Sequence, residues 1–211
     1  MISRFHVAVA AFGLSLATVG AQATTILESG DAGQLTGTAQ IVGGVHSGDN
    51  ILGSLTGGDV DLYRFSVAAG VVTINTFTGP QLGDPQLFLF DASGNGIGEN
   101  DDASGFGLQS EISLNLAAGT YYIGISYFNN DALNGSGNDI FDYVPAFSDL
   151  NGNSIQGPNG AGGPLLASWR TTSQGSGSYN ITFVSASVPE PATLLLLGLG
   201  LTGLGLARRR S

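Results

Sequence analysis

Residues 60–67 read VDLYRFSV, and this stretch decides the fold class. Apolar and polar side chains alternate along it, and a period of two is typical of a half-buried β-strand. A turn at Gly70 leads into a β-branched run at 71–77, which favours a second strand. The sequence therefore predicts consecutive strands joined by a tight turn.

The same signals recur on both sides of this pair. Four consecutive apolar residues within 85–90 indicate a central strand that is covered on both faces. Between the two chain ends, no stretch has the sustained spacing of an amphipathic helix. Short strands separated by Gly-rich turns predict an all-β fold, a β-sandwich or jelly roll. Its further strands are expected at 85–90, 111–116, 120–127 and 179–184, with weaker signals at 38–42 and 50–55.

Residues 129–178 interrupt this pattern with a long segment rich in Gly, Asn, Asp and Pro. A structureless loop of that length is uncommon in a compact domain. The segment is a functional insertion, a pair of weakly signalled strands or a disordered excursion. Its apolar residues favour partial packing on the domain: Phe141, Tyr143, Phe147, Leu165, Leu166 and Trp169.

The N-terminus has the features of a secretory signal peptide. Arg4 supplies a positive charge, residues 7–19 form an apolar run, and Ala21 and Ala23 are small residues at the positions that a signal peptidase reads. We expect residues 1–23 to form the signal-peptide helix that precedes the sandwich and to be removed by signal peptidase.

The C-terminus carries a second, tripartite signal. It consists of Pro189-Glu190-Pro191, an uncharged run at 192–207, and the basic residues Arg208, Arg209 and Arg210. A helix over the run would reach about 24 Å, somewhat short of the roughly 30 Å hydrocarbon core. Because arginines stay on the cytoplasmic side, a single transmembrane helix at 192–207 would hold the chain transiently in the inner membrane, with residues 24–187 outside the cytoplasm.

Removal of both ends leaves a strongly acidic chain. The remaining chain has two basic residues, Arg64 and Arg170, and fifteen acidic residues, which gives a net charge of about −13. The sequence has no lysine. Such a surface repels nucleic acid and anionic lipid, so neither is an expected partner. The complete lack of cysteine excludes disulfides, thiolate zinc sites and cysteine nucleophiles.

Catalytic signals are weak, and we predict that the protein is not an enzyme. His46 is the one histidine between the two signals, and no Gly-x-Ser-x-Gly elbow occurs. Without lysine, Schiff-base chemistry is excluded as well. Paired carboxylates can hydrolyse glycosides, but the acids of this chain cluster in turns rather than on cleft strands.

Calcium is the better chemical candidate, because Ca²⁺ prefers several carboxylate and carbonyl oxygens. Asp59 and Asp61 lie two apart, so both point to one face of a strand. An alternative makes this pair structural, with the carboxylates capping turns and pairing with backbone amides. No EF-hand spacing or Gly-Gly-x-Gly-x-Asp repeat is present. The other candidate ligands are Asp84, Glu99, Asp101 and Asp102.

Trp169 lies in the insertion, where an exposed indole could stack on sugar rings. The alternative is that the indole folds inward, as tryptophans of β-sandwiches usually do. Both interpretations stay open at this stage.

The C-terminal tripartite signal resembles the PEP-CTERM sorting signal of exopolysaccharide-producing Gram-negative bacteria. The resemblance covers residues 188–211 and rests on Pro189-Glu190-Pro191, the Leu/Gly-rich run and the terminal arginines. It implies recognition by a membrane-embedded exosortase and cleavage near the Pro-Glu-Pro, followed by release or attachment at the cell surface.

The body is similar to the bacterial pre-peptidase C-terminal (PPC) domain, a β-sandwich often appended to secreted enzymes. Three stretches carry the resemblance: the Asp-x-Asp strand at 58–70, the strand at 84–91, and the Gly-Thr-Tyr-Tyr strand at 118–125. The similar core covers about 50–128, with a closing strand at 179–184. The long insertion at 129–178 and the lack of an attached catalytic domain depart from that family.

Together these observations predict an exported, non-enzymatic protein of the cell surface or extracellular matrix of a Gram-negative bacterium, associated with exopolysaccharide. Two alternatives remain: a carbohydrate-binding or adhesion module, which would have measurable affinity for a defined glycan, and a secreted hydrolase, which would need a cleft with converging acids.

Overall fold

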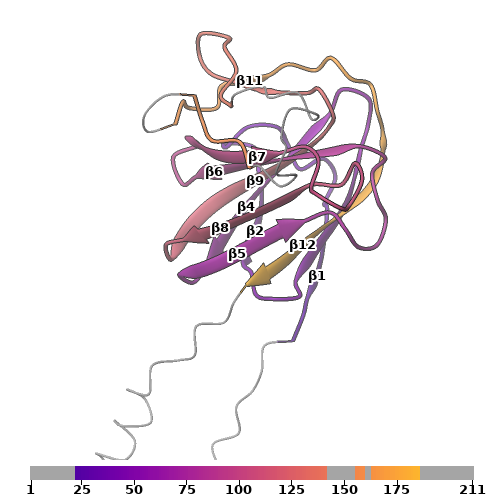
Figure 1. The fold of residues 1–211 in the computed structure, drawn as a ribbon, viewed down its shortest axis with the longest axis vertical. Coiled ribbons are helices and arrows are strands. Elements are labelled where there is room, and N and C mark those ends of the chain that lie inside the picture. Colours follow the sequence, from indigo (N-terminus) through magenta and orange to yellow (C-terminus); the bar gives the residue numbers. More distant parts are fainter. Residues whose placement is uncertain (1–21, 142–154, 160–162, 186–211) are drawn as a thin grey trace, which may run out of the picture.

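The computed structural model describes residues 22–141, 155–159 and 163–185. Two five-stranded sheets face each other as a sandwich (Figure 1). The described residues contain no helix long and apolar enough to cross a bilayer. The signal-peptide helix and the transmembrane segment 192–207 expected from the sequence lie outside the described residues.

The first sheet has the strand order β1-β3-β12-β5-β8 and the second has the order β2-β4-β9-β6-β7. Most neighbours are antiparallel, whereas β1 pairs with β3 and β2 pairs with β4 in parallel. A separate two-stranded ribbon, β10-β11, belongs to the insertion. The strands are β1 (Thr25–Leu27), β2 (Gln40–Gly44), β3 (Asn50–Leu55), β4 (Val60–Val67), β5 (Gly70–Asn75), β6 (Pro85–Asp91), β7 (Gly96–Asn100), β8 (Glu111–Leu116), β9 (Gly119–Tyr127), β10 (Ala132–Leu133), β11 (Ser168–Trp169) and β12 (Gly177–Ser185).

The predicted all-β sandwich is confirmed, and every strand expected from the sequence is present. The strand expected at 179–184 is longer than predicted and lies in the middle of its sheet, between β3 and β5. Four further strands, β1, β7, β10 and β11, gave no signal that we recognised in the sequence.

The main core fills the space between the two sheets. Its largest fully buried side chains come from facing strands: Tyr63 and Phe65 on β4, and Tyr179 and Phe183 on β12. The rings of Phe65 and Phe183 lie with centroids 5.2 Å apart, so the two sheets contact each other directly through aromatic packing.

A second apolar cluster lies on the opposite face of the β4-β9-β6 sheet. Leu62, Phe88 and Phe90 point away from the main core, and the insertion covers them with Ile140, Phe141, Leu166 and Trp169. In Figure 1 the insertion, including β11, lies beside β6 and β7. The expectation that the insertion packs partially on the domain is therefore confirmed for its described residues.

The second apolar cluster also changes the interpretation of β4. The half-buried strand expected at 60–67 holds for the second half of β4, where Arg64 and Ser66 are partly exposed between buried neighbours, and is wrong for Val60–Tyr63, where every side chain is buried. Leu62 packs under the insertion, whereas Tyr63 and Phe65 point into the main core. The double coverage expected for 85–90 is confirmed, and the same insertion causes it.

The insertion also covers the free edge of β7. The backbone amide of Glu99 donates to the Gln156 carbonyl at 3.0 Å, and the Gln156 amide donates to the Glu99 carbonyl at 2.9 Å. An uncovered edge strand would offer unpaired backbone groups to another chain. The pairing therefore protects a Gly-rich strand and holds Glu99 beside the insertion.

Candidate functional site

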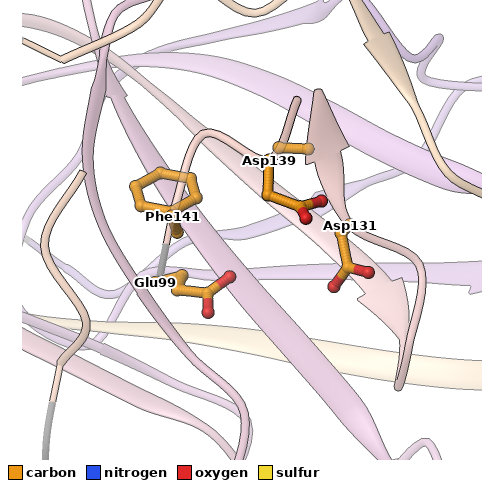
Figure 2. Close-up of a pocket in the computed structure, with 5 residues that line it drawn as sticks. Glu99, Asp131, Asp139 and Phe141 are labelled. Atoms are coloured by element: carbon orange, nitrogen blue, oxygen red, sulfur yellow. The ribbon is translucent and has the colours of Figure 1, made fainter. Parts of the chain in front are cut away.

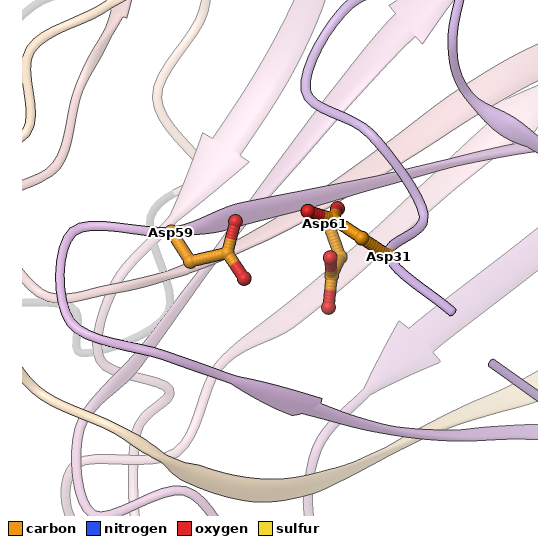
Figure 3. A group of neighbouring side chains, drawn as sticks. All are labelled: Asp31, Asp59 and Asp61. Carbon is orange, nitrogen blue, oxygen red and sulfur yellow. The ribbon is translucent and has the colours of Figure 1, made fainter. Parts of the chain in front are cut away.

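Three carboxylates gather at one end of the sandwich (Figure 3). Asp59 ends the turn before β4, Asp61 lies on β4, and Asp31 comes from the loop after β1. Their nearest carboxylate oxygens all lie within 4.8 Å of one another. The structure thus brings together the predicted pair Asp59 and Asp61, and adds Asp31 as a third carboxylate that sequence spacing did not indicate.

Asp61 is the buried member of this group, with no exposed surface. Asp61 and Tyr63 lie two residues apart on β4, so their side chains point to the same face of the sheet, toward the core between the sheets. The Tyr179 hydroxyl donates to Asp61 Oδ2 at 2.5 Å, and the hydroxyls of Tyr179 and Tyr63 are also 2.5 Å apart. Asp61 Oδ1 has no hydrogen-bond partner among the described residues.

The surroundings of Asp61 favour its uncharged form. Burial is the largest cause of a raised pKa of Asp61, the hydrogen bond from Tyr179 lowers it, and the charges of Glu28, Asp59 and Asp31 raise it. Together these effects bring the pKa of Asp61 to about 8. A buried carboxyl of this kind must bind a proton or gain a cation to remain in place. The group therefore has the donor chemistry of a Ca²⁺ site.

The other two members are held by the backbone. Asp59 Oδ1 accepts from the Val60 amide at 2.9 Å and from Gln34 Nε2 at 3.3 Å. Asp31 Oδ1 accepts from the Gly33 amide at 2.9 Å. These contacts match the structural alternative for Asp59, so the pair combines one turn-stabilising carboxylate with one buried carboxyl that has an unsatisfied oxygen.

A second group contains Asp84, Asp101 and Asp102, whose nearest oxygens also lie within 4.8 Å of one another. Burial raises the pKa of Asp84 to about 6 and that of Asp101 to about 8, and it also raises the pKa of Asp102. Asp101 Oδ1 and Asp102 Oδ1 are buried without a hydrogen-bond partner in the described part of the chain. Asp84 thus joins two candidate ligands that lie well beyond it in sequence.

Glu99 is separated from Asp101 and Asp102 and lines a small pocket with Asp131, Asp139 and Phe141 (Figure 2). Its side chain is only 6% exposed, and Gln86 Nε2 donates to its Oε2 at 3.2 Å. Burial, and after it the charges of Asp131 and Asp101, raise the pKa of Glu99 to about 8. Glu99 and Asp101 lie only two residues apart, and the charge of Asp101 contributes to the raised pKa of Glu99, so the pocket and the Asp84 group are electrostatic neighbours.

Beside this pocket, Arg170 joins different parts of the insertion to one another. Its guanidinium lies 2.9 Å from Asp131 Oδ2 and 2.8 Å from Asp139 Oδ1. Burial raises the pKa of Asp131, while the hydrogen bond and charge of Arg170 lower it. The arginine therefore neutralises part of a crowded acidic pocket and ties the segment after β11 to the segments on both sides of β10.

Trp169 packs inward. Its indole lies edge-on to Phe88 at a centroid distance of 5.0 Å and to Phe90 at 6.2 Å, and its Nε1 donates to the Gln34 carbonyl at 2.6 Å. The ring and its polar atom are thus both engaged with the domain. Of the two interpretations from the sequence, the geometry favours packing over sugar stacking.

His46 is exposed on the loop after β2, where its Nδ1 lies 3.4 Å from Asp49 Oδ2. Among the hydrogen bonds between described residues, none joins the imidazole of His46 to a serine or threonine hydroxyl. Of the predicted processing residues, Ala23 lies exposed before β1, whereas Ala21, Pro189, Glu190, Pro191, Arg208, Arg209 and Arg210 lie outside the described residues.

The fold and these groups define a class: an acidic β-sandwich domain with buried carboxyl clusters and a covering insertion. Residues 59–126 match the family model of the bacterial pre-peptidase C-terminal domain, and residues 187–210 match that of the PEP-CTERM protein-sorting motif. Both resemblances drawn from the sequence are confirmed. The motif makes this an exported protein that passes through a membrane-anchored intermediate and is processed by an exosortase.

No curated protein matches the chain. Among solved structures, it is similar to the pre-peptidase C-terminal domain of collagenase from Bacillus anthracis, with 18% identity and a TM-score of 0.36 over 68% of this chain and 92% of that chain. It is also similar to PliG of Aeromonas hydrophila, a periplasmic lysozyme inhibitor of g-type lysozyme, with 16% identity and a TM-score of 0.33 over 68% of this chain and 97% of that chain. Neither likeness is close enough to carry a functional conclusion.

Proposed function

We propose that the processed protein is a non-enzymatic component of the extracellular polysaccharide matrix at the surface of a Gram-negative bacterium. The observation that carries this proposal is the sorting motif at 187–210, which marks the chain for export. In our proposal that body spans 24–187, with the similar core at about 50–128, the insertion at 129–178 and the closing strand at 179–184. The partners are then signal peptidase, the exosortase and the matrix polysaccharide.

The described chemistry supports a non-enzymatic role. Catalysis needs a nucleophile or an acid and base that converge on a substrate site. Among the acids with strongly raised pKa values, Asp61 lies in one group, whereas Glu99 and Asp101 are electrostatic neighbours beside the small pocket of Glu99. The pocket at Glu99 has room for about one water molecule, with a volume near 10 Å³, and is too small for a sugar.

Intact-mass analysis of the protein from culture medium, cell envelope and extracted matrix tests this proposal. We expect a chain that begins after Ala23 and ends near Pro189-Glu190-Pro191, enriched in the matrix fraction. An unprocessed protein confined to the cytosol would refute both the export and the matrix role.

We further propose that Asp31, Asp59 and Asp61 bind Ca²⁺, with Asp84, Asp101 and Asp102 as a second site. The observation that supports a metal site is the buried oxygen of Asp61, which has no hydrogen-bond partner among the described residues and lies beside two other carboxylates. A cation bound there would neutralise the repulsion between the three carboxylates. Glu99 belongs to neither group in the structure, so its role as a ligand depends on the pocket with Asp131 and Asp139.

Thermal unfolding with and without calcium tests the metal proposal. A ligand that binds only the folded state stabilises it by about 2.7 kcal/mol at one hundred times its dissociation constant. We expect addition of EDTA to lower the melting temperature by several degrees and Ca²⁺ to restore it. A melting temperature that responds to neither treatment would end the calcium proposal and leave the matrix role untouched.

A further inference from the structure

One aromatic ring stands out on the surface of the domain. Phe106 lies in the loop between β7 and β8 and is 53% exposed, whereas the other aromatic residues of the described chain are buried or half-buried. Leu108, two residues further, is 51% exposed. Exposure of large apolar side chains at one spot of a strongly acidic protein often marks an interaction site.

The ring of Phe106 is supported from behind by a second ring. Phe77, half-buried after β5, lies parallel to it with centroids 3.7 Å apart and an interplanar angle of 8°. Stacking covers one face of Phe106, so its exposed surface consists of the opposite face and the ring edges. The result is a flat aromatic platform of two layers.

The loop that carries Phe106 is closed by hydrogen bonds at its base. The Ala103 amide donates to the Gln109 carbonyl at 2.7 Å, and the Ser110 amide donates to Thr76 Oγ1 at 3.0 Å. The second bond joins the Phe106 loop directly to the segment that carries Phe77. A loop that is already ordered loses little conformational entropy when a ligand binds.

Glycines on both sides keep the ring accessible. Gly105 and Gly107 have φ values of +81° and +69°, a region that favours glycine, and a Cβ added to either would meet no atom within 4 Å. The space beside the ring is therefore open to a ligand. The backbone conformation that presents Phe106 would be strained with most other residues.

We propose that the platform formed by Phe106 and Phe77 binds the neutral sugar rings of a matrix polysaccharide. A pyranose ring has an apolar C–H face that packs flat on an aromatic ring, and its hydroxyls stay at the edge of the contact, where they keep their hydrogen bonds to water. The net charge of about −13 disfavours an anionic polymer. This inference rests on the proposed matrix role and gives it a binding surface.

The geometry also explains why Trp169 is not the platform. The indole is engaged with Phe88, Phe90 and the Gln34 carbonyl, whereas Phe106 contacts one ring and leaves the other face free. The aromatic stacking suspected from the sequence is thus assigned to a different loop.

Affinity electrophoresis of the processed protein tests the proposal. Three gels each contain one neutral polymer: a β-1,4-glucan, a mannan or a galactan. A fourth gel contains anionic alginate for comparison. We expect retardation by at least one neutral polymer and none by alginate. Phe106→Ala should weaken the retention about tenfold or more, because most of the apolar contact is lost. Phe106→Trp, which keeps a flat ring, should retain it.

Val184→Ala is the matched control, since Val184 is a similarly exposed apolar residue (45%) on β12. Equal retention of the wild type and Phe106→Ala would overturn the platform, and so would a wild type that no neutral polymer retards. A wild-type dimer in light scattering that Phe106→Ala converts to a monomer would also overturn it, by assigning the surface to a second copy of this chain.

The matrix fractionation described above separates the two ideas. If Phe106→Ala fails to bind but the wild type is absent from the matrix, the matrix role fails while the platform stands. If both proteins remain in the matrix and bind glycans equally, the platform fails while the matrix role stands.

Discussion

Substitution of Asp61 by Asn separates the cost of its buried charge from its benefit as a metal ligand. In the absence of metal, the folded state holds a proton on Asp61 up to about pH 8, whereas the unfolded chain releases it near 3.8, the ordinary pKa of an aspartate side chain. The folded state therefore binds more protons between these values, and the stability of the wild type falls as pH rises through this window. The Asn variant lacks this pH dependence.

The magnitude follows from the width of the window. Each pKa unit corresponds to about 1.36 kcal/mol, so keeping Asp61 protonated costs about 4 kcal/mol at pH 7. The new amide takes the place of the unsatisfied Oδ1 and costs about 1–3 kcal/mol if it remains unpaired. We expect a net gain of about 2 kcal/mol for Asp61→Asn at pH 7 in EDTA, or about 4–8 °C in melting temperature for a domain of this size.

Thermal unfolding followed by circular dichroism at pH 4 and pH 7 measures this difference. At pH 4 the carboxyl is protonated in the folded state and in part of the unfolded chains, so the cost of keeping the proton falls below about 1 kcal/mol. The gain should then disappear, and the cost of the unpaired amide should leave the variant no more stable than the wild type. In saturating Ca²⁺ at pH 7 the melting temperature of the wild type should rise to that of the variant or above it, because the wild type keeps the metal ligand that the variant has lost. Asp31→Asn is the control in EDTA, since Asp31 is exposed and its substitution should change the melting temperature little.

An Asp61→Asn variant that melts below the wild type at pH 7 in EDTA would refute the reasoning. A gap of equal size at both pH values would refute it as well, because a buried charge must produce a difference that depends on pH.

Three further substitutions test other contacts. Arg170→Gln removes the ion pairs to Asp131 and Asp139 and should cost about 1 kcal/mol, since solvent screens the half-exposed guanidinium, and more at pH 8 than at pH 5. Hydrogen exchange should become faster in β10 and β11 while the core is unchanged, and unchanged exchange in these strands would contradict the reasoning. Trp169→Ala should cost about 3 kcal/mol in denaturant unfolding while glycan retention persists; lost retention with normal stability would instead support sugar stacking. Gly53→Ala places a Cβ against the Tyr179 hydroxyl and should cost more than about 2 kcal/mol. Gly37→Ala is the control, since Gly37 also lacks a positive φ and a Cβ there meets no atom within 4 Å, and it should change stability little.

The strands that the sequence predicted are those in which side-chain alternation or β-branching carries the signal, such as 60–67 and 111–116. The missed strand β7 contains Gly96, Gly98 and Asn100, residues with low strand propensity. It forms because β6 supplies hydrogen bonds on one side and Gln156 supplies them on the other. Pairing that depends on distant segments leaves little trace in a local pattern.

The candidate sites show the same division. Asp59 and Asp61 were recognisable because they lie two apart on one strand, whereas Asp31 joins them only through the path of the loop after β1. Asp131 and Asp139 likewise reach Glu99 only through the insertion. Distance along the chain hides such neighbours, since loops of any length can bring carboxylates together.

By itself, the sequence determined the all-β class, the acidic charge and the sorting motif, because each depends on local composition or on a short contiguous pattern. Only the tertiary structure decided which carboxyl group is desolvated, which part of β4 the insertion covers, and which aromatic ring remains in contact with solvent. Those properties depend on desolvation and packing between segments far apart in the chain, and neither quantity is defined until the chain has folded.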